Sequence, residues 1–518
     1  MAGSQRYNDR DDEHDSHEER RGLLGGTATG WHDDDEHYPA QQYTEKQQAP
    51  VNTWSNSRLL GVAVGVILLL VGGVAVKDKL AQLFVPHIPL RFDANEVLSN
   101  GTHEFKRTVL LVSIDGLRAD YLDRGLTPHL LDISKQGLRA KSMKPIFPTL
   151  TFPNHWALMT GLHAESHGIV ANNFWDPASD LEFHYNQATS AWNPDWWFGE
   201  PMWETAGKAG LITANLMWPG PPATKSGAQP TYFVPWKDKV SLDDKLKQIL
   251  FWLDLEADDK PQLILAYEPS LDQAGHAYGP GSKQVNDTLL TVDSFARQLH
   301  DSIEARNLTD IVDIVFVSDH GMTDTSHPEL VYIDDVLGPQ GMADIVHEDG
   351  WPSMGIRFSE TSNASHYLDL LLAASDKHPE AFDVYTHETM PERYHFSNNE
   401  RIAPIYVVPK VGYALTTHAQ GDIGMSAGNH GYDNEELSMH AMFVAHGPFA
   451  VALKQVHHAS SSFWSRGEKE GWHSTADGAY IMDRFPNVEI YNLVMHLLGI
   501  EEAAAPTNGT VGFWDKYL

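Results

Sequence analysis

The sequence contains no cysteine. Disulfide bridges, thiolate zinc sites and cysteine nucleophiles are therefore excluded as explanations of its stability or chemistry. The chain is also poor in positive charge, with 37 Lys and Arg residues against 70 Asp and Glu residues and a formal net charge of −33. Proteins that bind nucleic acid by charge carry a basic surface, so this acidic balance argues against that class.

Aliphatic residues are scarce in residues 1–58, whereas acidic runs such as Asp33–Glu36 are frequent. A segment of this composition cannot bury enough apolar surface to fold, so we interpret it as a disordered tail. Within it, Glu19–Leu24 has the sequence of an acidic dileucine sorting signal, which cytosolic adaptor complexes bind. Such a signal would place the tail in the cytosol and direct the protein to an endosomal or vacuolar membrane.

Residues 59–76 carry no charge and are flanked by Arg58 and Lys77. A helix of this length rises about 27 Å, enough to cross a bilayer core of about 30 Å, so we predict one transmembrane helix here. A buried core helix is the alternative, whereas a cleavable signal peptide is excluded because the apolar run starts too late and is too long.

Potential N-glycosylation acceptors all follow this segment, which favours a type II protein with a lumenal or extracellular body at an endosomal, vacuolar or plasma membrane. The acceptors are Asn100, Asn286, Asn307, Asn363 and Asn508.

The globular part is predicted to span residues 105–500, after a stalk at 77–104 and before a tail at 501–518. Apolar runs at 108–114, 262–267 and 311–317 read as buried strands, and helical stretches separate them. This alternation predicts an α/β fold with a mostly parallel sheet and helices on both faces. Ligands gather beyond the carboxyl ends of such strands, where Asp115 and Asp319 are placed.

Metal-ligating residue types occur in four short motifs, and two of these directly follow predicted strands. The motifs contain Asp115, Asp272 with His276, Asp319 with His320, and His430. Asp272 and His276 are four residues apart, so a helical turn would place them on one face. Each motif alone is more often a structural turn, but together they supply three carboxylates and three imidazoles. Zinc favours this set when cysteine is absent, and six ligands suit two ions.

Thr151 lies just before a helix-like stretch, at a predicted N-cap shortly ahead of Pro153. One interpretation is that its hydroxyl only caps the helix. The functional interpretation is that the hydroxyl binds a metal ion and ionises, because a cation lowers the pKa of a bound hydroxyl. A helix N-terminus would further favour an alkoxide and an anionic substrate.

The order of these motifs resembles the nucleotide pyrophosphatase/phosphodiesterase family of the alkaline phosphatase superfamily. The resemblance runs over about residues 108–449, and its most specific parts are 148–155, 160–172 and 428–434. With an acidic tail, one span and no cysteine-rich modules, the chain resembles a fungal-type, single-pass form with an alkaline-phosphatase-like core. It departs from the family where Ser270-Leu271 separates Glu268-Pro269 from Asp272, although the Asp-to-His spacing is intact.

The resemblance implies a role for each motif residue. One zinc ion would be held by Asp115, Thr151, Asp319 and His320, and the other by Asp272, His276 and His430. Thr151 would be the nucleophile and form a phospho-threonine intermediate, while Asn172 would donate its amide to a phosphate oxygen. Phe152 and Tyr267 align with aromatic positions that sandwich a nucleobase in the family. Four nearby histidines are not aligned with ligands and are interpreted either as structural or as supporting a ligand without binding metal: His155, His163, His167 and His446.

The implied activity is hydrolysis of phosphodiester and pyrophosphate bonds of nucleotides, with release of nucleoside 5′-monophosphates. The alternatives are a phospholipid-type phosphodiesterase, and a phosphomonoesterase or mutase, which usually adds basic residues around the extra phosphate charge. A sulfatase is disfavoured because its nucleophile motif is absent. A non-enzymatic receptor or adhesion ectodomain would be expected to lack some of these ligands. Residues 322–428 are predicted to form part of the pocket wall.

Overall fold

The computed structural model describes residues 91–421, 425–450, 472–474 and 480–517. The predicted tail, its sorting signal, the predicted transmembrane helix at 59–76 and most of the stalk lie outside these residues. Among the described residues, no helix has the length and apolar character needed to cross a membrane.

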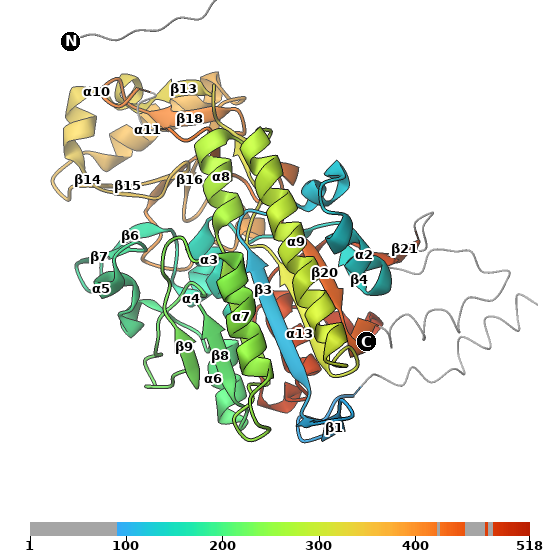
Figure 1. The fold of residues 1–518 in the computed structure, drawn as a ribbon. Helices are drawn as coiled ribbons and strands as arrows, with labels where there is room; N and C mark the ends of the chain where they lie inside the picture. The colour runs from blue at the N-terminus through green and yellow to red at the C-terminus, as the bar shows by residue number, and fades with distance from the viewer. Residues whose placement is uncertain (1–90, 422–424, 451–471, 475–479, 518) are drawn as a thin grey trace, which may run out of the picture. The chain divides into compact units, whose positions relative to one another are not determined.

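A nine-stranded sheet forms the centre of the fold, in the order β21-β22-β4-β20-β11-β3-β10-β8-β9 (Figure 1). The five strands from β11 to β9 are parallel to one another, whereas β20 runs antiparallel to both β11 and β4, so the sheet is mixed. The three strands predicted from the sequence are β3, β10 and β11. The bounds are β3 (Thr108–Ile114), β4 (Leu138–Ala140), β8 (Thr213–Leu216), β9 (Tyr232–Val234), β10 (Leu263–Glu268), β11 (Val312–Val317), β20 (Phe443–His446), β21 (Trp472–Ser474) and β22 (Tyr480–Met482).

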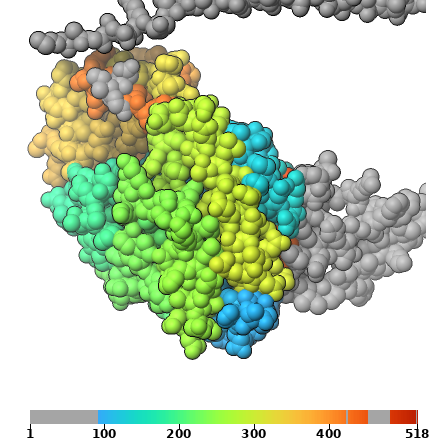
Figure 2. Space-filling model, viewed as in Figure 1, coloured from blue at the N-terminus to red at the C-terminus, as the bar shows by residue number. Residues whose placement is uncertain are grey.

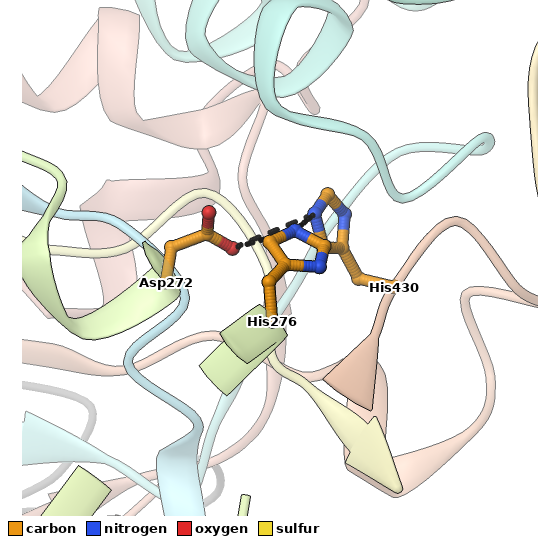
Figure 3. Close-up of side chains that lie close together, drawn as sticks. All are labelled: Asp272, His276 and His430. Atoms are coloured by element: carbon orange, nitrogen blue, oxygen red, sulfur yellow. Dashed lines mark hydrogen bonds and ion pairs between the residues drawn. The ribbon is translucent and has the colours of Figure 1, made fainter. Parts of the chain in front are cut away.

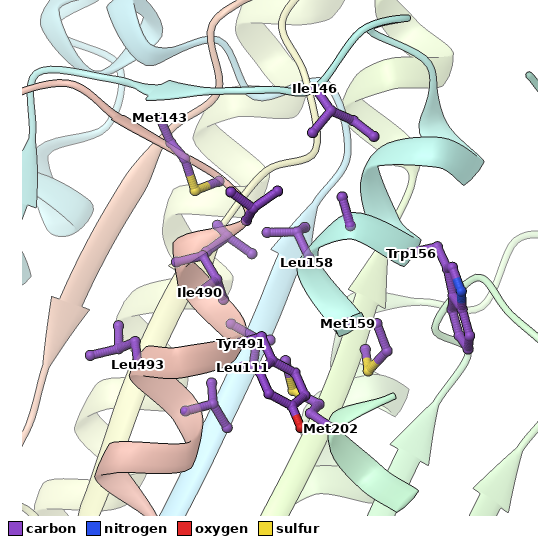
Figure 4. Close-up of a cluster of buried hydrophobic side chains, with 14 of the residues drawn as sticks. Leu111, Met143, Ile146, Trp156, Leu158, Met159, Met202, Ile490, Tyr491 and Leu493 are labelled. Carbon is purple, nitrogen blue, oxygen red and sulfur yellow. The ribbon is translucent and has the colours of Figure 1, made fainter. Parts of the chain in front are cut away.

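Helices cover both faces of this sheet, as predicted. Every residue of β3 is buried, and successive side chains point to opposite faces. Val109 and Leu111 join one hydrophobic cluster, which Figure 4 shows packed against α3 and α13, while Leu110 and Val112 join a second cluster under α7 and α9. The α7, α8 and α9 helices form much of the surface in the space-filling view (Figure 2). The helices of this part are α2 (Pro128–Gln136), α3 (Thr151–Thr160), α4 (Ala164–His167), α5 (Ala188–Ala191), α6 (Met202–Lys208), α7 (Leu242–Leu253), α8 (Ser270–Tyr278), α9 (Lys283–Ala305) and α13 (Glu489–Leu497).

A smaller unit with its own core lies in the chain between β12 (Thr323–Asp324) and β19 (Gly428–Asn429). Its four-stranded antiparallel sheet has the order β14-β15-β17-β16, and a parallel pair, β13 and β18, lies beside it. Two helices pack on this unit, and Gly338 breaks the first of them with a φ of 68°. The elements are β13 (Glu329–Tyr332), α10 (Ile333–Asp344), β14 (Ile345–Asp349), β15 (Met354–Phe358), α11 (Ala364–Lys377), β16 (Phe382–Thr386), β17 (Ile405–Pro409) and β18 (Tyr413–Thr416).

Short paired strands and 3-10 turns complete the described chain. The strand pairs are β1 (Leu98–Ser99) with β2 (Glu104–Phe105), β5 (Met143–Lys144) with β23 (Phe485–Pro486), β6 (Asn173–Asp176) with β7 (Leu181–His184), and β12 with β19. The 3-10 turns are η1 (Ala119–Arg124), η2 (Pro194–Trp196), η3 (Glu392–Tyr394), η4 (Leu437–Met439), η5 (Glu501–Ala503) and η6 (Phe513–Lys516).

The last described residues return to the core, although 501–518 was expected to be a tail. Trp514 and Tyr517 are 6% and 2% exposed, and the indole N–H of Trp514 donates to the carbonyl of Glu489 on α13. Two large aromatic residues at the end of a chain gain more by burial than a polar tail would, which explains the difference.

Candidate metal centre

The ends of two neighbouring strands bring the first donors together. Asp115 directly follows β3, and Asp319 and His320 follow β11, its parallel neighbour. Because parallel strands end at the same edge, these side chains converge. Nε2 of His320 lies 3.4 Å from a carboxylate oxygen of Asp115 and 3.0 Å from one of Asp319. The three side chains are at most 1% exposed.

A second group of donors comes from α8 and from the loop after β19. Asp272 and His276 are one turn apart on α8, and the predicted shared face is confirmed by a 3.4 Å contact between their side chains. Nε2 of His430 lies 3.5 Å from the same carboxylate oxygen of Asp272, as Figure 3 shows. The candidate donor atoms of these three residues all lie within 4.8 Å of one another.

The donors fall into two groups. The inner group comprises Asp115, Thr151, Asp319 and His320, and the outer group comprises Asp272, His276 and His430. The two groups adjoin each other, because donor atoms of Asp115, Asp272 and His320 also lie within 4.8 Å of one another.

Backbone carbonyls set the orientation of all three imidazoles. Nδ1 lies 2.9 Å from the Gly428 carbonyl in His276, 2.9 Å from the Gly321 carbonyl in His320 and 2.8 Å from the Thr149 carbonyl in His430. A carbonyl oxygen only accepts, so each Nδ1 carries the hydrogen of the neutral ring. Each Nε2 then presents a lone pair, which is the arrangement found in metal-ligating histidines.

Two of these lone pairs face each other at short range. The Nε2 atoms of His276 and His430 are 3.1 Å apart. Two neutral imidazoles of this tautomer would repel each other at that distance. A cation placed among the two Nε2 atoms and the Asp272 carboxylate would instead attract all three groups. The spacing therefore fits a metal ion in the outer group.

Buried carboxylate oxygens without a hydrogen-bond partner mark the same place. They belong to Asp115, Asp272 and Asp319, and all three face the histidine Nε2 atoms. An unpaired buried carboxylate is costly, so each of these oxygens fits a metal ligand. Nitrogen and oxygen donors without sulfur suit borderline or hard divalent cations.

The pKa values of these groups reflect how closely the buried donors are packed. Burial, with the negative charges of Asp319 and Asp272, raises the pKa of Asp115 well above its usual value. Burial, with the neighbouring His320 and His276, lowers the pKa of His430 well below its usual value. A bound cation would favour the ionised carboxylates and the neutral imidazoles that ligation needs.

Thr151 stands beside the inner group at the start of α3. Leu150, with φ −110° and ψ 154°, is the N-cap, so Thr151 is the first helical residue and the predicted cap position was wrong by one. The reason is that Leu150 keeps the extended backbone that a cap requires. The Thr151 hydroxyl lies 3.2 Å from Nε2 of His320. Its side chain therefore faces the donors instead of capping the helix.

Asn172 is hydrogen-bonded to the first turn of α3. Its side-chain oxygen accepts a 3.0 Å hydrogen bond from the backbone N–H of Phe152. With the oxygen engaged, the amide NH₂ is the group left to donate into the cleft that Asn172 lines. Phe152 also lines this cleft, and its ring packs against Tyr185 at 5.3 Å between centroids.

Tyr267 contacts the inner group, whereas the family resemblance implied contact with a nucleobase. The ring is 7% exposed, and its hydroxyl donates a 2.5 Å hydrogen bond to Asp115. Tyr267 lines the cleft, but its hydroxyl is hydrogen-bonded to the Asp115 carboxylate. This geometry favours a role for Tyr267 in orienting Asp115 over a role in stacking on a nucleobase.

Asp115, Thr151 and the outer group line a cleft of about 1270 Å³. Residues 325–328 and 425–427 line it, which confirms that the region between Met322 and Gly428 contributes to the wall. Aromatic side chains also line the cleft, and Trp236 among them is 53% exposed. No Lys or Arg is among the described residues that line the cleft. Trp236 was not singled out from the sequence, because nothing in the neighbouring residues indicates that it reaches the cleft.

The four histidines that are not aligned with ligands lie outside the cleft lining. His155 is fully buried, with one nitrogen 3.3 Å from Asp319 and the other 2.8 Å from the Ser113 hydroxyl. His163 stacks on His395, and His446 packs edge-on against His300. His167 is buried, and its Nδ1 accepts from the backbone N–H of Ile169. His155 therefore contacts a proposed ligand, whereas no such contact is seen for the other three among the described residues.

The model of the type I phosphodiesterase/nucleotide pyrophosphatase family matches residues 109–433, which contain both donor groups. The chain belongs to this family. A Schizosaccharomyces pombe pyrophosphatase/phosphodiesterase is 36% identical over 473 residues, covering 90% of each chain. As a member of this family, the chain is a hydrolase that acts on phosphodiester and pyrophosphate bonds.

Two further relatives help to place this family member. The bis(5′-adenosyl)-triphosphatase of Xenopus laevis is 33% identical, covering 78% of this chain and 80% of its own. Human ectonucleotide pyrophosphatase/phosphodiesterase family member 1 is 32% identical over 79% of this chain, and the match spans only 41% of that relative. The chain therefore corresponds to less than half of the human protein.

Solved structures confirm the fold of the family member. Murine ectonucleotide pyrophosphatase/phosphodiesterase 5 has a TM-score of 0.67 and 30% identity, and the match covers 80% of this chain and 100% of the murine one. An inactive threonine-to-alanine form of that protein was solved in complex with AMP. The alkaline-phosphatase-like α/β fold with a mixed sheet is thus shared.

Proposed function

We propose that the chain is a two-zinc nucleotide pyrophosphatase/phosphodiesterase in which Thr151 attacks phosphorus. The observation that carries the proposal is the convergence of unpaired carboxylate oxygens and imidazole lone pairs beside the Thr151 hydroxyl. The inner group would hold one zinc ion and the outer group the other. When bound, the ions would supply positive charge that activates the threonine hydroxyl and stabilises the phosphoryl oxygens.

The residues of the chain divide the reaction between them. The Thr151 oxygen forms a bond to phosphorus while the bond from phosphorus to the leaving oxygen breaks, and the hydroxyl proton passes to the leaving group or to solvent. The product is a phospho-threonine whose phosphate still carries the nucleoside. Water then cleaves that ester, releasing the nucleoside 5′-monophosphate and restoring Thr151. The N-terminus of α3 favours both the alkoxide and the anionic substrate, because its backbone N–H groups carry partial positive charge.

Asn172 and the aromatic wall orient the substrate. The free amide NH₂ of Asn172 would donate to a phosphate oxygen that does not leave. Phe152 and the exposed ring of Trp236 border the same cleft and would contact a nucleobase. The AMP complex of the murine relative, in its inactive threonine-to-alanine form, supports a nucleotide substrate for this cleft.

The location proposed for this activity is the lumenal or extracellular side of a membrane. Residues 59–76 would anchor the chain, and adaptor complexes would bind Glu19–Leu24 on the cytosolic side. Protease treatment of sealed vesicles tests this topology: the catalytic body should be protected and the first residues digested. Digestion of the catalytic body in sealed vesicles would contradict it.

A substrate panel tests the activity. The full chain in detergent should hydrolyse bis-p-nitrophenyl phosphate much faster than the monoester, and should release AMP from ATP or a dinucleoside polyphosphate. Chelation should abolish turnover and added zinc should restore it. Preference for the monoester, preference for a phosphocholine lipid, or full activity after zinc removal would each contradict the proposal in a different way.

A further inference from the structure

A buried ion pair lies at the start of α8, the helix that carries Asp272 and His276. Lys245 on α7 and Glu268 at the end of β10 are each 5% exposed in their side chains, and Lys245 Nζ lies 2.7 Å from Glu268. Neither residue is among those that line the cleft. A buried pair of charges seldom stabilises a fold by more than its desolvation costs, so its location calls for an explanation.

Glu268 occupies the start of the helix that carries Asp272 and His276. Pro269 is the N-cap of α8 and makes no side-chain cap. Instead, Glu268 accepts a 2.8 Å hydrogen bond from the backbone N–H of Ser270, the first residue of the helix. A carboxylate at this position satisfies a free N–H group and matches the positive end of the helix.

Lys245 contacts both the Glu268 carboxylate and the backbone at the end of β10. Besides Glu268, its ammonium group donates a 2.9 Å hydrogen bond to the carbonyl of Tyr267. Tyr267 in turn donates its hydroxyl to Asp115 of the inner group. Lys245 therefore holds Tyr267 and Glu268. These two residues connect Asp115 of the inner group with α8, which carries Asp272 and His276.

This segment is also where the sequence departs from its family pattern, because Ser270-Leu271 stands between Glu268-Pro269 and Asp272. We propose that Glu268, held by Lys245, is a positioning residue that sets the start of α8 and thereby the geometry of Asp272 and His276. The inference rests on the proposed metal centre. Neither residue enters the reaction, and their effect is on the affinity of the outer group for its ion.

Paired substitutions in the full chain test this proposal without leaving a single buried charge. Lys245→Met with Glu268→Leu removes both charges and the acceptor for Ser270. Lys245→Met with Glu268→Gln removes the charges but keeps an acceptor oxygen. We expect the first variant to bind zinc at the outer group about tenfold or more weakly, and the second to recover most of that affinity. A chelating dye in competition measures both constants.

The matched control is another buried ion pair of the sheet, Arg107 with Asp313, at the opposite end of β3 and β11. Arg107→Met with Asp313→Leu should lower the melting temperature at least as much, yet leave zinc affinity within about twofold, because distant sites act independently. Equal loss of zinc affinity in this control would overturn the positioning role. So would a failure of the Glu268→Gln pair to bind zinc more tightly than the Glu268→Leu pair. A wild-type chain that binds no zinc would overturn the metal centre itself, which distinguishes the two failures.

Discussion

The inner and outer groups of the metal centre differ in how they are held. The inner donors Asp115, Asp319 and His320 follow strand ends and are at most 1% exposed. In the outer group, Asp272 and His276 stand on a nine-residue helix and are 13% and 33% exposed. The sheet therefore fixes one half of the centre, while the other half depends on how α8 is placed.

This difference suggests a division of labour. The proposed nucleophile Thr151 faces the inner group, where the buried donors cannot move without disturbing the sheet. The outer group lines the cleft, through which the leaving group would depart and water would enter in the proposed mechanism. A rigid attacking side would hold the nucleophile in line with the leaving group, which is the orientation that an in-line displacement requires.

The strongest test of the inner side is Thr151→Ala. We expect kcat to fall by about 10³-fold or more, because the atom that bonds to phosphorus is lost. Zinc stoichiometry should stay the same, since the aspartates and histidines remain. Thr291→Ala is the control, because Thr291 is exposed on α9 and does not line the cleft. Wild-type-like turnover of Thr151→Ala would remove the nucleophile from the inner side and end the comparison.

A second test separates charge stabilisation from ligation. Asn172→Ala should lower kcat about 10²-fold, the usual cost of losing one donor to a developing oxyanion, without changing zinc content. The neighbouring Asn173 is exposed and does not line the cleft, so Asn173→Ala serves as the matched control. Equal effects of the two substitutions on turnover would show that Asn172 does not contact phosphate.

The sequence was sufficient for most of the inner group, because a buried apolar strand followed by Asp or His places those side chains at a known edge. The same logic located β3, β10 and β11. The same reasoning could not predict that β20 joins the sheet antiparallel to its neighbours, because the direction of β20 depends on a long-range connection. The small unit at 329–416 was also missed, since strands such as β13 and β14 are only partly buried and lack a clear pattern.

Side-chain direction was the other limit. The alignment placed Tyr267 among aromatic residues for a nucleobase, but the backbone at the end of β10 turns its hydroxyl onto Asp115. Trp236 reaches the cleft only because β9 joins the edge of the sheet beside β8. Neither outcome can be read from spacing along the chain, because each depends on how neighbouring strands are ordered.

The two groups should release zinc at different rates. Because Asp272 and His276 of the outer group are partly exposed, a chelator should remove the outer ion first, roughly tenfold or more faster than the inner one. His276→Ala should abolish the fast phase alone, whereas His320→Ala should affect the slow one. His327→Ala, a cleft histidine outside both groups, is the control. Release of both ions in one phase would contradict the difference between the groups.

The smallest expected effect concerns the open side of the cleft. Trp236 is 53% exposed there, so Trp236→Ala should leave folding intact. Stacking of a base on an aromatic ring contributes about 1–3 kcal/mol, which predicts a rise in KM for nucleotides of roughly tenfold with little change in kcat. Phe251→Ala provides the control, because Phe251 is 59% exposed on α7 and does not line the cleft. A fall in kcat with unchanged KM would place Trp236 on the reacting side, and the open half of the site would then take part in the chemistry as well as in binding.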